Sequence, residues 1–137
     1  MIQAGPMAKR KNPQRILYLG ERRNNAIVTT LKRAGFAVAT LHTLDHGVAF
    51  TVHNPVDLVI LDQAIFIEVD GWSPAQSFKL VKPNICIVVM TTSEKFGNGL
   101  PIGVDAFIHK RSNLLLVAAV KRLLAHTKAI AAKAGAP

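Results

Sequence analysis

Short apolar runs alternate with segments of helical period along most of the chain, and this alternation is the strongest constraint on the fold. The clearest run is "VDLVIL", residues 56–61, whose near-continuous apolar character is typical of a strand buried on both faces. Such strands separated by helices form a parallel sheet with helices on both sides. The predicted strands are 15–20, 36–41, 56–61, 85–90 and 104–109. We therefore predict an α/β fold with a doubly wound, five-stranded parallel sheet.

The intervening segments carry helix signals of unequal strength. Helices are predicted at 22–35, 43–55 and 74–82, with a last helix starting after Ser112. Ser73 followed by Pro74 is a typical helix start, since serine caps the free N–H groups and proline suits the first helical position. The segment 93–102 is poor helix material because it contains glycines and a proline.

Length and composition are those of one ordinary domain. The chain has 137 residues, half of them hydrophobic, which is enough for a core without disulfides. We predict a basic N-terminal tail at 1–14, one domain at 15–127 and a C-terminal tail at 128–137. The single cysteine, Cys86, lies in an apolar run and cannot form an internal disulfide, which indicates a reducing, cytoplasmic setting. No apolar run approaches the roughly 20 residues that span a bilayer.

The formal charge of +9, from 17 Lys and Arg against 8 Asp and Glu, raises the question of an anionic partner. The basic residues are spread along the chain, without interleaved aromatic residues or a recognition motif, so we do not expect nucleic-acid binding. A histidine metal site is not expected either. His42 and His46 have helical spacing but lack a third ligand nearby.

Polar side chains follow the ends of four predicted strands. They are Glu21, Asp62, Thr91 and Lys110. Because the carboxyl ends of parallel strands meet at one edge of the sheet, these groups should converge. A buried carboxylate needs a partner. Lys110 could offset the charge of Asp62 in a structural ion pair, or Glu21 and Asp62 could share a hard cation such as Mg²⁺.

Four motifs in order carry a resemblance to a known family. They are "RILYLGE" at the first strand, "DLVILD" at the third, "IVVMTT" at the fourth and "GVDAFIHK" at the fifth. Over about residues 14–127 the chain resembles the receiver domain of bacterial two-component response regulators. The resemblance implies a flavodoxin-like receiver fold, with strand order 2-1-3-4-5 and five helices.

The resemblance also implies roles for single residues. Asp62 falls at the phosphoacceptor, which takes a phosphoryl group from the phosphohistidine of a sensor histidine kinase or phosphotransfer protein. Thr91 and Lys110 fall at positions that contact this phosphoryl group, and Phe107 falls at the aromatic switch. These roles suit the chemistry, because a carboxylate can form an acyl phosphate while cations spread the charge of the transferring group.

The magnesium site of the family maps onto Glu21, Asp62 and the backbone carbonyl of Ala64. Gly20 stands where the family has its first acidic residue, so the resemblance implies a weak Mg²⁺ site. On this interpretation, replacing Gly20 with aspartate should tighten Mg²⁺ binding. Arg111 replaces the proline that commonly follows the lysine in the family.

These observations favour a single-domain response regulator receiver in phosphorelay signalling, with a downstream protein partner. It would not be an enzyme beyond its own phosphorylation and dephosphorylation. The alternative is a degenerate receiver that acts as an interaction module without phosphorylation. We further expect Phe107 to rest inward without phosphorylation and switching to appear as ordering of 93–102.

Overall fold

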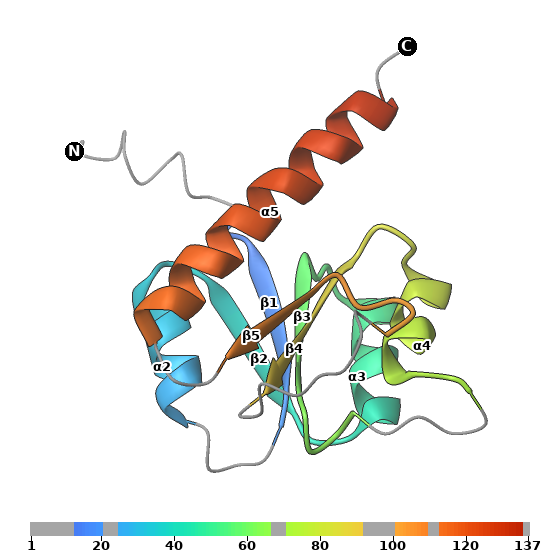
Figure 1. Cartoon of the computed structure of the whole chain (residues 1–137), viewed down its shortest axis with the longest axis horizontal. Coiled ribbons are helices and arrows are strands. Elements are labelled where there is room, and N and C mark those ends of the chain that lie inside the picture. Colours follow the sequence, from blue (N-terminus) through green and yellow to red (C-terminus); the bar gives the residue numbers. More distant parts are fainter. Residues whose placement is uncertain (1–12, 21–24, 67–70, 92–100, 110–112, 136–137) are drawn as a thin grey trace.

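The fold is a single parallel sheet, seen in a computed structural model that describes residues 13–20, 25–66, 71–91, 101–109 and 113–135 (Figure 1). Its five strands lie in the order β2-β1-β3-β4-β5, and every neighbouring pair is parallel. The strands are β1 (Arg15–Leu19), β2 (Ala37–Leu41), β3 (Leu58–Asp62), β4 (Cys86–Thr91) and β5 (Ala106–His109). The predicted strands and strand order are therefore confirmed.

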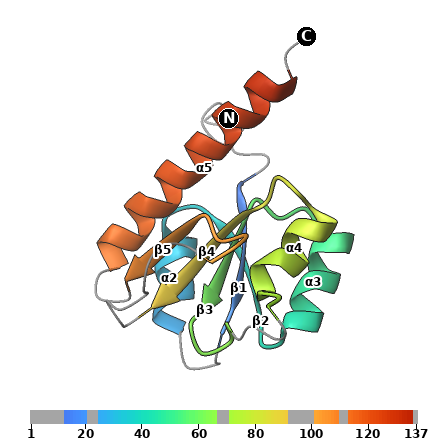
Figure 2. The ribbon, with the colours of Figure 1, turned by 45° about the vertical axis from the view of Figure 1, so that its right-hand side comes forward.

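The described helices cover both faces of the sheet. They are α2 (Asn25–Arg33), α3 (Leu44–His53), α4 (Pro74–Val81) and α5 (Asn113–Gly135). Figures 1 and 2 show α2 and α5 on one face and α3 and α4 on the other. Most of the predicted basic tail and most of the segment 93–102 lie outside the described residues.

Two apolar clusters, one on each face, hold these layers together. The first cluster joins the sheet to α2 and α5 and includes Tyr18, Ile60 and Leu116. The second joins it to α3 and α4 and includes Leu61, Val89 and Phe78. All residues of β3 and β4 are buried, which explains why each strand is apolar up to its last residue. Cys86 is one of these buried residues, as its apolar setting predicted.

The last helix continues past the predicted end of the domain. Residue 127 was the predicted end of the domain, with a tail beyond it, but α5 continues to Gly135. The segment after 127 is rich in alanine, the best helix former, and contains no glycine before residue 135. Figures 1 and 2 show the end of α5 extending past the sheet. No described helix is both long enough and apolar enough to cross a membrane.

The start of α4 is fixed by a capping box. The Ser73 hydroxyl accepts from the Gln76 N–H, and the Gln76 side chain accepts from the Ser73 N–H at 2.8 Å. The same hydroxyl donates to the Ile102 carbonyl at 2.8 Å and so ties the helix to the segment before β5. The predicted Ser–Pro start is therefore confirmed, with a long-range contact that the sequence did not indicate.

Replacing Ser73 with alanine should lower the free energy of unfolding by about 1–2 kcal/mol, because the cap is lost and a carbonyl loses its donor. Urea unfolding followed by circular dichroism measures this change. Thr29→Ala, at an exposed position of α2, is the control and should change stability by less than about 0.5 kcal/mol. Equal stability of the two variants would contradict a capping role.

Candidate functional site

The carboxyl edge of the sheet gathers the polar residues that end the central strands. Asp62 ends β3 and lies opposite Met90, directly before Thr91 at the end of β4. Thr91 in turn pairs with His109 at the end of β5. Asp62 and Thr91 are each only 3% exposed, although their side chains are polar. The structure thus brings these two predicted site residues to adjacent strand ends.

Both carboxylate oxygens of Asp62 accept hydrogen bonds. The Ala64 N–H donates to Oδ1 at 2.9 Å, and the Tyr18 hydroxyl donates to Oδ2 at 3.2 Å. Tyr18 comes from β1, 44 residues earlier, and is completely buried. These two donors offset part of the cost of burying the carboxylate, and they fix its orientation.

The Thr91 hydroxyl is also engaged. It donates to the side-chain oxygen of Gln63 at 2.6 Å, while the Gln63 N–H donates to the Met90 carbonyl at 2.9 Å. Gln63 directly follows Asp62, so the connection after β3 contacts both the carboxylate and the threonine at once. Sequence reasoning did not identify Gln63, because its reach to the neighbouring strand depends on the turn that follows Asp62.

The other predicted site residues divide into two groups. Ala64 lies in the turn after β3, and its N–H contacts Asp62 as described. Phe107 is half-buried in β5 and packs against the second cluster. Its response to a phosphoryl group stays a prediction. Glu21 and Lys110 lie outside the described residues, so their predicted roles are untested.

His109 is an unusual member of this edge. Both of its ring nitrogens are buried, and neither has a hydrogen-bond partner in the described part of the protein. Such a group destabilises a fold unless a water or ligand contacts it. No three His, Cys, Asp or Glu side chains come together at a possible metal position among the described residues.

The described residues at this edge lack one acidic residue of a magnesium site of the family type. Residue 20, where the family has its first acid, is a glycine, and Asp62 already uses both oxygens in hydrogen bonds. A side chain at position 20 would also meet an obstacle. A Cβ atom built there lies 2.6 Å from the ring and hydroxyl of Tyr18. The remaining acid, Glu21, lies outside the described residues.

Comparison with solved structures finds matches for this fold of sheet and helices. A CheY-like response regulator receiver domain protein from Methanospirillum hungatei JF-1 matches with a TM-score of 0.69 and 19% identity. The match covers 85% of this chain and 98% of that one. The chain has the fold of a response regulator receiver domain. Neither a family model nor a curated protein matches its sequence.

Two further matching structures contain magnesium. The receiver domain of a sensor histidine kinase from Pseudomonas aeruginosa PAO1 holds magnesium in its active-site cleft. It matches with a TM-score of 0.71 and 18% identity, over 83% of this chain and 99% of that one. A response regulator from Thermotoga maritima, in complex with Mg²⁺ and BeF, matches with a TM-score of 0.65 and 24% identity, over 80% and 98%. At these identities the likeness establishes the receiver fold.

Proposed function

We propose that this chain is a response regulator receiver that accepts a phosphoryl group on Asp62 from a histidine kinase or phosphotransfer protein. The observation that carries the proposal is the buried Asp62 carboxylate at the carboxyl end of β3, with the Thr91 hydroxyl at the end of the adjacent strand. A carboxylate that is buried, oriented by two donors and adjacent to a hydroxyl is a suitable nucleophile for an acyl phosphate.

In the proposed step, one Asp62 oxygen attacks the phosphorus atom and forms a new P–O bond. The P–N bond to the donor histidine breaks, and its electron pair stays on the imidazole nitrogen. Thr91 then changes partner, from the Gln63 side chain to a phosphoryl oxygen, and Lys110 contributes a point charge to the same group. The protein needs no proton of its own for this transfer.

Weak Mg²⁺ binding by Glu21, Asp62 and the Ala64 carbonyl belongs to the expectation from the resemblance. A divalent cation in receivers neutralises charge on the transferring phosphoryl group. The described residues supply one carboxylate for it, with both oxygens already engaged. We therefore assign no step to the cation and propose that phosphoryl capture here depends on Mg²⁺ only weakly.

Incubation with acetyl phosphate tests the proposal directly, with Mg²⁺ in one arm and a chelator in the other. Intact mass should show one added phosphoryl group, and the adduct should resist acid and be released by base. Peptide mapping should place it on the segment that contains Asp62. Absence of the adduct in both arms, and with a histidine-kinase phosphodonor, would refute the proposal.

The contact between Thr91 and Gln63 leads to a further prediction. Gln63→Met keeps the side-chain length but removes the acceptor of the Thr91 hydroxyl. The hydroxyl of this variant can therefore turn to the phosphoryl group without first breaking a hydrogen bond to residue 63. Since one such bond is worth about 0.5–1.5 kcal/mol, capture from acetyl phosphate should be roughly two- to tenfold faster. Gln14→Met, before β1, is the control. A slower reaction in Gln63→Met would show that the glutamine assists capture.

A second function, an interaction module that needs no phosphorylation, is favoured by one observation. Position 20, where the family has an acidic residue, is a glycine, and the Tyr18 ring fills the space that a side chain there would need. A protein of this kind would bind its downstream partner equally well with Asp62 intact or neutralised.

We propose the cytoplasm as the location and signalling proteins as partners, whichever of the two functions the protein has.

A further inference from the structure

Gly20 is not required by the backbone conformation at its position. The described glycines with left-handed φ angles are Gly35, Gly71 and Gly103, so position 20 does not require glycine for its φ angle. Position 20 requires glycine because there is no space for a side chain beside it. A Cβ atom at position 20 would lie 2.6 Å from Cε2 and the hydroxyl oxygen of Tyr18, closer than real Cβ atoms approach other atoms. Gly20 directly follows β1, and residues two apart in an extended chain point to the same side, which explains why these two positions compete.

The backbone of Gly20 has little freedom to move away. Its N–H donates to the Leu41 carbonyl at 3.2 Å, and its own carbonyl lies 2.8 Å from the Nδ1 atom of His42. Both partners come from the end of β2 and the residue after it. Residue 20 is therefore held at the sheet edge from the side of β2, and any side chain larger than hydrogen must displace Tyr18 instead.

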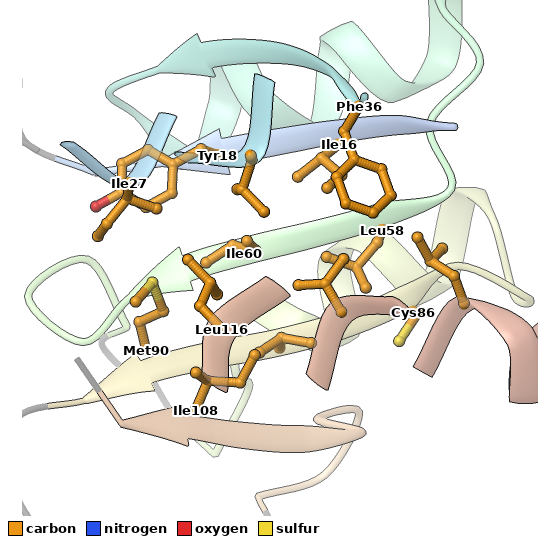
Figure 3. Packing of buried hydrophobic residues seen from close by; sticks show 14 residues of the cluster. Ile16, Tyr18, Ile27, Phe36, Leu58, Ile60, Cys86, Met90, Ile108 and Leu116 are labelled. Atoms are coloured by element: carbon orange, nitrogen blue, oxygen red, sulfur yellow. The ribbon is translucent and has the colours of Figure 1, made fainter. Parts of the chain in front are cut away.

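Tyr18 has little freedom either. Its side chain is 0% exposed and belongs to the first cluster, and Figure 3 shows its ring beside Ile27, with the hydroxyl directed toward the carboxyl ends of the strands. That hydroxyl donates to Oδ2 of Asp62. Rotation of the ring would break this bond and disturb a fully packed region of the core.

We propose that Tyr18 and Gly20 form one coupled pair that takes over, at Asp62, the place of the missing acidic residue and its cation. The phenol occupies the space of a residue-20 side chain, and its hydroxyl holds the Asp62 oxygen that a cation would otherwise contact. Tyr18 is thus a positioning residue for the phosphoacceptor. This inference deepens the proposed function and rests on it for its biological meaning.

The pair has a consequence that single substitutions cannot reveal. Gly20→Asp alone supplies a carboxylate but leaves the phenol in its path, so the tightening of Mg²⁺ binding expected from the sequence should not occur. Tyr18→Val alone clears the space but supplies no carboxylate. Only Tyr18→Val/Gly20→Asp provides both, so a large gain in Mg²⁺ affinity should appear in this variant alone.

The experiment titrates Mg²⁺ into the wild type, both single variants and the double variant. The Ala64 amide signal reports binding by NMR, because this N–H contacts Asp62. Sodium chloride at matched ionic strength is the control. We expect weak binding in the wild type and both single variants and the large gain only in the double variant. Equal tightening by Gly20→Asp alone, or no gain in the double variant, would overturn the inference.

Two additional measurements keep the test decisive. If Gly20→Asp does not fold while the double variant does, the steric half of the coupling is supported. Tyr18→Phe keeps the ring and removes the hydroxyl. It should slow phosphoryl capture several-fold, because Asp62 loses one of the two donors that orient it, and unchanged capture would refute the positioning role. The titration uses unphosphorylated protein, so failure of phosphorylation leaves its result intact and the two failures can be distinguished.

Discussion

Asp62→Asn will accept no detectable phosphoryl group from acetyl phosphate, although its fold will be intact. The amide nitrogen and oxygen are too weakly nucleophilic to form an acyl phosphate, so the reaction loses its acceptor atom rather than a fraction of its rate. The variant keeps one oxygen that can accept from either Tyr18 or Ala64, and it no longer buries a charge. Its stability should therefore equal or exceed that of the wild type.

Intact mass after incubation measures the loss, and urea unfolding measures stability. Asp45→Asn is the matched control, because it makes the same chemical change at an exposed carboxylate in the first turn of α3. The control should be phosphorylated at the wild-type rate. Phosphorylation of Asp62→Asn at that rate would show that another residue is the acceptor and would exclude the proposed role of Asp62.

Phe78→Ala will have the largest effect on stability, with a loss of about 3–5 kcal/mol in the free energy of unfolding. Phe78 is fully buried in α4 and belongs to the second cluster. It lies under α3 at Gly47, where an added Cβ would come within 3.1 Å of the end of its ring. Alanine would leave a cavity between two helices and the sheet, and this closely packed site cannot collapse to fill it.

Chemical unfolding detects this change as a shift in midpoint with an unchanged slope. Leu80→Ala on the same helix is the control, since that side chain is 74% exposed and should contribute less than about 0.5 kcal/mol. If the two variants were equally stable, Phe78 would not anchor α4 to the sheet, and its packing in the second cluster would not contribute to stability.

The sheet could be predicted because its strands are buried on both faces. That burial forces long apolar runs such as "ICIVVM", and parallel pairing requires helices between them, so sequence order alone restricts the architecture. The position of Asp62 at a strand end followed from the same pattern. The length of α5 could not be predicted in this way, because the alanine-rich stretch after residue 127 lacks the apolar period that marks a packed helix.

The environment of the phosphoacceptor was less accessible to sequence reasoning. Tyr18 lies inside an apolar run and was interpreted as part of a strand, since nothing in its neighbours indicates a contact 44 residues away. Gly20 was interpreted as a lost carboxylate, whereas its structural meaning is a space filled by an aromatic ring. A tyrosine two residues before a glycine, at the end of a central strand, is the signal that could have connected them.

Because α5 extends beyond the sheet, a small tilt of this helix would produce a larger displacement at its free end. Among the described side chains of α5, Leu124 is the last in the first cluster, and the helix continues to Gly135, roughly 16 Å further at the usual rise per residue. The base of α5 lies against β4, β5 and α2. A tilt of about 10° about Leu124 would carry the free end through roughly 3 Å, given the same rise. A rearrangement of the sheet edge too small to alter the core would thus be amplified at the far end of the last helix.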